Sequence, residues 1–128
     1  MAKPGYTGLR RIVHAAHFSA LGLQQAWRYE AAFRQELALT AVLGPVAVWL
    51  GESPLETLLL IAPLILLLIV ELLNSAVEAV VDRVGHEHHA LSGRAKDMGS
   101  AAVLLSVGLL IAVWVTVLLP DLLRNPPA

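Results

Sequence analysis

The chain has 128 residues, of which 57% are hydrophobic and 15% are charged, and its formal net charge is −1. A soluble domain has about 45–50% apolar and about 25% charged residues, and a chain of this length cannot hide such an apolar excess from water. We therefore expect lipid to cover part of its surface. The composition excludes a disordered chain, the charge gives no support for a nucleic-acid partner, and the absence of cysteine excludes disulfides and thiolate metal sites.

The first predicted element is an amphipathic helix at about residues 6–28. Apolar residues recur on one stripe at helical spacing, and basic or polar residues occupy much of the remaining surface. The stripe comprises Leu9, Ile12, Val13, Ala16, Ala20, Leu23 and Trp27. A helix with this pattern, a basic flank and a tryptophan is typical of one that lies along a membrane surface. The alternative is an ordinary helix packed on the rest of the protein.

Three uncharged apolar stretches follow, each bounded by acidic residues. A bilayer core needs about 20 apolar residues of helix, and each stretch reaches this length when its neighbours are included. The predicted membrane helices span about 31–50, 54–84 and 93–119. The predicted fold is therefore an all-α integral membrane protein with one domain, residues 1–128, made of a surface helix and three membrane helices.

Local signals mark where these helices begin and end. Residues 53–56, Ser-Pro-Leu-Glu, read as a capping box with proline at the first helical position. Gly85 is predicted to end the second membrane helix, and Ser92 to cap the third. Pro120 cannot donate a helical hydrogen bond, so we expect the third helix to end near Leu119.

The distribution of basic residues predicts the orientation in the membrane. Five of the nine Lys and Arg residues precede residue 35, and three lie between residues 83 and 96, whereas the 51–56 turn has none. The positive-inside rule places the N-terminal part and the 82–97 segment in the cytoplasm. The 51–56 turn and the C-terminus are then outside.

The second predicted membrane helix carries one polar stripe. Its residues, at i, i+3, i+4, i+7 and i+11 on one helical face, are Glu71, Asn74, Ser75, Glu78 and Asp82. Glu71 follows Glu56 by fifteen residues, a rise of about 22 Å, which places it near the cytoplasmic headgroup boundary of a core about 30 Å thick. Glu78 lies about 10 Å further toward the cytosol.

This stripe predicts two chemical roles. An ionisable residue inside a membrane is costly and indicates function. Glu71, the deeper and partly desolvated carboxylate, suits a general base, and Glu78 suits a hard cation such as Mg²⁺. The alternative is a polar seam that joins helices. For Glu30, which precedes the first membrane helix, the alternative to metal ligation is a surface pair with Arg34.

The 82–97 segment is the only sizeable polar stretch after Arg34. Arg94 and Lys96 fall near a predicted helix N-terminus, which suits a phosphate group, although positive-inside topology alone also explains them. The chain has no Walker A or Gly-x-Gly-x-x-Gly sequence, so any nucleotide site is unconventional. The cluster of His86, His88 and His89 is interpreted as a solvated loop, because no His-Glu-x-x-His spacing supports a metal site.

Three segments resemble the prokaryotic diacylglycerol kinases: residues 30–36, Glu-Ala-Ala-Phe-Arg-Gln-Glu, and the segments 70–83 and 93–103. The most specific motifs are Glu-x-x-Asn-x-x-x-Glu and the later Ala-Lys-Asp, and the resemblance covers roughly residues 8–119. It implies a small enzyme of the inner membrane that forms homotrimers with active sites shared between subunits. Such an enzyme, active on the cytoplasmic side, uses Mg²⁺ and ATP to convert diacylglycerol into phosphatidic acid for phospholipid recycling.

The resemblance also implies roles for individual residues. Glu71 corresponds to the base, and Glu30 and Glu78 to Mg²⁺ ligands. The implied nucleotide contacts are Arg11, Phe18, Glu30, Glu78, Glu87, His88, His89, Lys96 and Asp97. The implied lipid-substrate contacts are Arg11, Ala15, Ser19, Arg34, Gln35, Glu71, Asn74 and Ser100. Phe18 stands where we expect tyrosine in the family, which keeps a stacking surface but loses a hydroxyl contact.

Three other functions compete with a diacylglycerol kinase. A kinase for a polyprenol such as undecaprenol is expected to have Asn-x-Arg after the residue matching Glu30, where this chain has Ala-Ala-Phe. A small proton-coupled exporter also uses a membrane glutamate, but near the midplane, whereas the acidic stripe runs out to the cytosol. A purely structural oligomer has no use for Glu30, Glu78, Lys96 and Asp97 together.

Overall fold

The computed structural model of the chain describes residues 7–124 except residue 86. This part of the chain forms four helices and no strand, which confirms the all-α class. The helices are α1 Leu9–Tyr29, α2 Ala31–Leu50, α3 Pro54–Val84 and α4 Ala90–Arg124. Residue 6 of the predicted surface helix and His86 of the histidine cluster lie outside the described residues.

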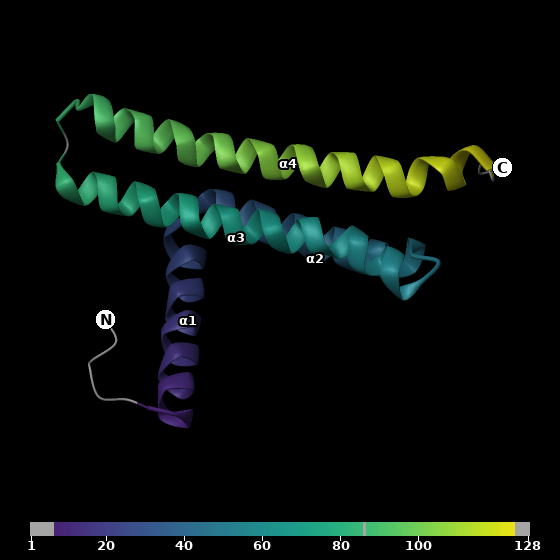
Figure 1. Cartoon of the computed structure of the whole chain (residues 1–128), viewed down its shortest axis with the longest axis horizontal. Coiled ribbons are helices and arrows are strands. Elements are labelled where there is room, and N and C mark those ends of the chain that lie inside the picture. The colour runs from purple at the N-terminus through teal and green to yellow at the C-terminus, as the bar shows by residue number, and fades with distance from the viewer. Residues whose placement is uncertain (1–6, 86, 125–128) are drawn as a thin grey trace.

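Helices α2, α3 and α4 run alongside one another, and α1 projects from them at a steep angle (Figure 1). Helix α3 is the central element, because it packs on α2 and on α4, while α1 contacts α2 next to it in sequence. The hairpin formed by α3 and α4 extends past the corner where α1 meets α2 (Figure 1). On one side of this corner α2, α3 and α4 form a three-helix bundle. On the other side α3 and α4 continue without α2, as a protruding two-helix hairpin (Figure 1).

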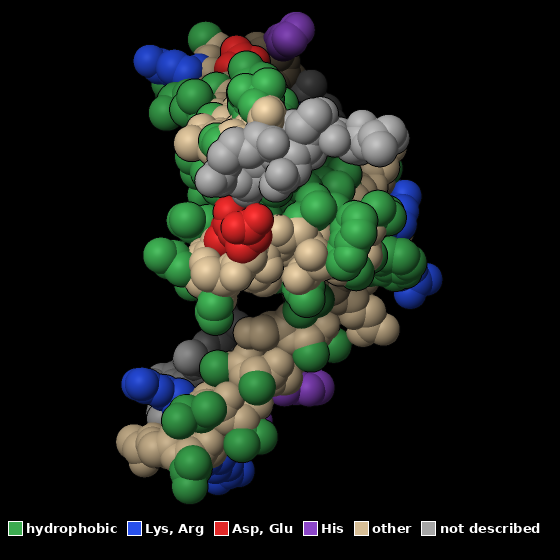
Figure 2. Space-filling view, turned by 90° about the vertical axis from the view of Figure 1, so that its right-hand side faces the viewer, with side chains coloured by type: hydrophobic (Ala, Val, Ile, Leu, Met, Phe, Trp, Pro, Cys, Tyr) green, Lys and Arg blue, Asp and Glu red, His purple; other side chains and the backbone are tan. Residues whose placement is uncertain are grey.

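Three helices in the described part are long and apolar enough to cross a membrane: Ala31–Leu50, Pro54–Val84 and Ala90–Pro120. Figure 2, seen from the end with the α2–α3 turn, shows hydrophobic side chains over much of the helical surface. Helix α3 has 31 residues, a rise of about 46 Å, so it exceeds a hydrocarbon core of about 30 Å. The protein is thus a membrane protein in which part of α3 reaches beyond the lipid core.

The core of the bundle lies where α3 and α4 meet. Leu64, Leu67 and Leu110 are buried against one another. Pro63, inside α3, has no amide hydrogen, and its ring disturbs the hydrogen bonds of the preceding turn. Trp114 of α4 donates its indole N–H to the Leu60 carbonyl in that turn, at 3.0 Å. This bond joins α4 to α3 in the turn that precedes Pro63.

The predicted start and end of α3 are confirmed in atomic detail. Ser53 Oγ accepts a hydrogen bond from the Glu56 amide at 3.2 Å, and the Glu56 carboxylate accepts one from the Glu52 amide at 2.7 Å. These bonds satisfy amides that have no partner within the helix. Val84 is the last helical residue and Gly85 follows it in an extended conformation.

Both predicted ends of α4 are wrong. The helix begins at Ala90, because His89 Nδ1 accepts a hydrogen bond from the Leu91 amide at 3.2 Å and takes the capping role. Ser92, the predicted cap, lies in the first turn. At the other end α4 continues through Pro120 to Arg124, because the fixed φ of proline is itself helical and the missing amide weakens the helix without stopping it.

Candidate active site

The acidic face of α3, defined as Glu71, Asn74, Ser75, Glu78 and Asp82, is held together by hydrogen bonds along the helix. Ser75 Oγ donates to Glu71 Oε1 at 3.5 Å, and Asn74 Nδ2 donates to Glu78 Oε1 at 3.1 Å. Each pair is four residues apart, which places the partners on successive turns of the helix. The predicted stripe is therefore a polar ladder of two separate hydrogen-bonded pairs, and Asp82 belongs to neither pair.

Glu71 is the buried end of this ladder, with only 4% of its surface exposed. It interacts electrostatically with Glu36, which α2 brings against the same part of α3. The Oε2 atom of Glu36 is buried and has no hydrogen-bond partner in the described residues. A buried polar atom without a partner is rare and calls for an explanation. The sequence assigned no role to Glu36, since only the packing of α2 on α3 reveals its neighbour.

Asn74 faces α4 at the next level of the ladder. Its Oδ1 atom is also buried without a hydrogen-bond partner in the described residues. Gly99 of α4 packs directly against this amide, so that a Cβ atom at residue 99 would overlap Asn74 Oδ1. Glycine at this position therefore leaves room for the Asn74 amide, which would have to move if residue 99 had a side chain. Gly99 is thus a site residue that the sequence pattern alone did not identify.

Replacing Gly99 by alanine should therefore displace the Asn74 amide and break its hydrogen bond to Glu78. Loss of a hydrogen bond to a charged group is worth about 1.5–3 kcal/mol, so we expect kcat/KM to fall by about tenfold or more while the protein still folds. Gly108→Ala is the matched control, because the space around that glycine of α4 is open. Equal activities of the two variants in a phosphorylation assay would contradict the role of Gly99.

The corner between α1 and α2 places Glu30 at the level of Glu71. Glu30 has an extended backbone between the two helices, and it interacts electrostatically with Glu71. Arg34 Nη1 donates to the Trp27 carbonyl at 2.9 Å, so it binds the C-terminal end of α1. The structure gives Arg34 no ion pair with Glu30, and this leaves the Glu30 carboxylate available to a ligand.

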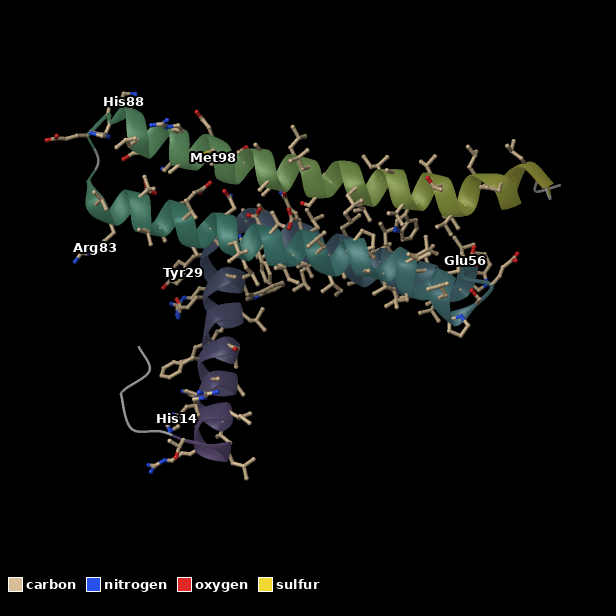
Figure 3. All side chains as sticks on the ribbon, viewed as in Figure 1. His14, Tyr29, Glu56, Arg83, His88 and Met98 are labelled. Carbon is tan, nitrogen blue, oxygen red and sulfur yellow. The ribbon has the colours of Figure 1, made fainter. Side chains whose placement is uncertain are left out.

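Lys96 of α4 faces the outer end of the acidic face. Its Nζ atom lies 2.6 Å from Asp82 Oδ1, and it also interacts electrostatically with Glu78. Arg83 and His88 mark the same end of the hairpin, opposite to Glu56 (Figure 3). Glu87 and Asp97 are exposed, and His89 caps α4. Of the predicted nucleotide contacts on this hairpin, Lys96 is therefore the one whose side chain contacts the acidic face.

The residues predicted on α1 are exposed, and Ser19 alone among them shares a groove with a member of the acidic face. They are Arg11, Ala15, Phe18 and Ser19, all exposed, on a helix that projects away from α3 and α4 (Figure 1). Ser19 alone among them lines a groove of about 740 Å³, together with Glu30 and with Leu72 and Ser75 of α3. Gln35 and Ser100 are exposed on α2 and α4 and do not line this groove.

The donors around Glu78 fit a magnesium ion that arrives with a nucleotide. In the described residues, no group of three acidic or histidine side chains is placed to hold a metal by itself. Mg²⁺ is usually bound by one or two carboxylates, with substrate phosphates and water completing the shell. Glu78 uses one carboxylate oxygen in its bond to Asn74 and keeps the other, whereas Asn74 Oδ1 is buried against Gly99 and is not accessible to an ion. A single carboxylate of this kind suits a hard cation whose other ligands are phosphate and water.

The site thus combines a buried carboxylate with groups suited to phosphate. Glu71 lies at the level of the corner between α1 and α2, where it interacts electrostatically with Glu30. Lys96 lies further along the hairpin, toward water.

Comparisons with known proteins identify a family. The family model described as prokaryotic diacylglycerol kinase matches residues 17–118. A diacylglycerol kinase of Pseudomonas aeruginosa is 53% identical over 115 residues, covering 90% of this chain and 94% of that protein. One from Escherichia coli is 52% identical over 108 residues, covering 84% and 88%, and one from Helicobacter pylori is 40% identical over 111 residues, covering 87% of each.

Proposed function

Because this chain belongs to the prokaryotic diacylglycerol kinase family, we propose that the acidic face of α3 is its active site and that Glu71 is the base. The chain is a membrane-bound kinase that uses ATP to phosphorylate diacylglycerol. Its relatives are named for diacylglycerol, which favours this lipid over undecaprenol, and a kinase family excludes the exporter. The observation that best supports this site is that Glu71 is buried and lies at the level of Glu30, at the corner between α1 and α2.

In the proposed reaction, the hydroxyl of diacylglycerol gives its proton to the Glu71 carboxylate as its oxygen attacks the γ-phosphorus of ATP. The bond from the γ-phosphorus to the bridging oxygen breaks, and ADP leaves. Such transfers depend mainly on positioning and on neutralising the phosphate charge. Ser75 orients the buried Glu71 through its hydrogen bond, and the groove beside Glu30 and Ser75 supplies an apolar route for the lipid.

Glu30 and Glu78 are the proposed ligands of Mg²⁺, and Lys96 is the proposed contact of the ATP phosphates. The ion would supply neutralisation of phosphate charge when bound. Within the chain, Asn74 orients the Glu78 carboxylate through its hydrogen bond. The remaining proposed nucleotide contacts are Arg11, Phe18, Glu87, His88, His89 and Asp97.

We also propose that α1 lies along the cytoplasmic surface of the membrane. Its steep angle to the three apolar helices supports this placement (Figure 1), as do its exposed apolar residues Leu9, Ile12 and Trp27. The hairpin of α3 and α4 would then stand in the cytosol, where ATP is available. The positive-inside rule gives the same orientation.

A homotrimer with shared active sites is the proposed assembly. The distance of α1 from the acidic face in a single chain supports sharing, because Arg11 and Phe18 would then serve a neighbouring subunit. The extensive exposed apolar surface of α2, α3 and α4 offers area for subunit contacts as well as for lipid.

The experiment that tests both the reaction and its orientation uses sealed membrane vesicles. ATP does not cross the bilayer, so ATP added outside should yield phosphatidic acid with inverted vesicles and not with right-side-out vesicles. Detergent should make both preparations equally active. In detergent, diacylglycerol should exceed undecaprenol in kcat/KM. Activity confined to right-side-out vesicles would contradict the orientation, and a preference for undecaprenol would contradict the substrate.

A further inference from the structure

Asp82 has a position that helix stability does not explain. It lies two residues before the end of α3 at Val84, where the helix dipole disfavours a negative charge. Its partner Lys96 belongs to another helix, and the two side chains are 55% and 42% exposed, respectively. An exposed ion pair of this kind adds little to stability. The role of the Asp82 carboxylate therefore lies in its effect on Lys96.

We propose that Asp82 is a positioning residue that holds the Lys96 ammonium over the acidic face, ready for the phosphates of ATP. The inference rests on the proposed function, since it takes Lys96 as a phosphate contact. Lysine has a flexible four-carbon stem, and an exposed ammonium without a partner would spend much of its time in solvent. The 2.6 Å contact with Asp82 Oδ1 fixes it beside Glu78.

The geometry leaves Lys96 able to bind phosphate without releasing Asp82. An ammonium has three N–H donors, and Asp82 Oδ1 takes one of them. The others can donate to phosphate oxygens placed between Lys96 and Glu78. Asp82 and Glu78 are four residues apart, on successive turns of α3. Asp82 would therefore hold Lys96 one turn away from Glu78, the proposed ligand of the Mg²⁺ ion that accompanies ATP.

The test compares the KM for ATP of Asp82→Asn, Asp82→Glu and the wild-type enzyme in detergent. We expect Asp82→Asn to raise the KM by about three- to fivefold, the scale of an exposed ion pair, with kcat within about twofold. Asp82→Glu keeps the charge and should restore most of the affinity. Arg83→Gln, which changes the adjacent exposed charge, is the control and should leave the KM unchanged.

A double-mutant cycle with Lys96→Gln separates this inference from the proposed function. If Asp82 acts through Lys96, adding Asp82→Asn to Lys96→Gln should raise the KM for ATP no further. An additive effect, or a KM for Asp82→Asn at or below the wild-type value, would overturn the positioning role alone. An unchanged KM for Lys96→Gln itself would overturn the assignment of Lys96 to ATP, and this inference with it.

Discussion

Replacing Glu71 by glutamine should lower kcat by about 10²–10⁴, the usual contribution of a positioned general base. Glutamine has nearly the same shape and can still accept the hydrogen bond from Ser75, but it cannot take a proton from the lipid hydroxyl. The loss should appear in kcat, because the nucleotide lies further along the helix. Steady-state kinetics with ATP and diacylglycerol in mixed micelles would measure it.

Two comparisons make the Glu71 result specific. Glu52→Gln removes a carboxylate from the exposed α2–α3 turn at the other end of the bundle and should leave kcat unchanged. Circular dichroism should show that Glu71→Gln keeps its helices, since it removes a buried charge and adds no volume. Near-normal turnover of Glu71→Gln would mean that Glu71 belongs to a structural polar seam.

Replacing Glu78 by glutamine should instead weaken Mg²⁺-dependent nucleotide binding together with turnover. A glutamine oxygen can still accept the bond from Asn74 Nδ2, so the variant removes the charge and keeps the ladder. Groups that merely support metal ligands contribute about 10–100-fold to metal affinity or activity, and we expect a direct ligand to contribute at least as much. The expected result is an increase of about tenfold or more in the KM for Mg·ATP.

Excess Mg²⁺ distinguishes this variant from the Glu71 variant. Raising the Mg²⁺ concentration should recover part of the activity of Glu78→Gln by mass action, whereas Glu71→Gln should not respond. Recovery of both variants, or of neither, would remove the basis for assigning the two carboxylates to different roles.

The sequence predicted the features of the fold that local chemistry determines. The capping box at Ser53 and the helix end at Gly85 depend on residues adjacent in the chain, and both are present in the structure. The ends of α4 were mistaken for equally local reasons. A histidine side chain caps the helix ahead of Ser92, and Pro120 is accommodated within the last turns. Propensity rules rank these outcomes but do not forbid them.

The candidate site was predictable along one helix and less so between helices. Spacing alone placed Glu71, Asn74 and Glu78 on one face of α3. The electrostatic interaction of Glu71 with Glu36 and the contact of Asn74 with Gly99 arise because α2 and α4 both pack on α3. No periodicity within a single helix encodes which residues of another helix will meet it.

Arg34 illustrates the same limit. Its spacing from Glu30 favours a salt bridge within a helix, yet the chain bends between α1 and α2, and the guanidinium reaches back to the Trp27 carbonyl. Glu30 is the N-cap of α2 with an extended backbone, and the Arg34 amide donates to its carbonyl at 3.3 Å, but the two side chains form no ion pair. The spacing of Glu30 and Arg34 therefore did not predict the partner of the Arg34 side chain, which is the Trp27 carbonyl.

The central proposal is that Glu71 takes the proton of the lipid hydroxyl and that Glu78 binds the nucleotide through Mg²⁺. The most direct measurement is the Mg²⁺-dependent binding of a non-hydrolysable ATP analogue to Glu71→Gln and Glu78→Gln, made side by side with the wild-type enzyme by isothermal titration calorimetry. The account predicts wild-type affinity for Glu71→Gln and an affinity reduced by about tenfold or more for Glu78→Gln. Equal affinities of the two variants, whether both retained or both lost, would contradict it.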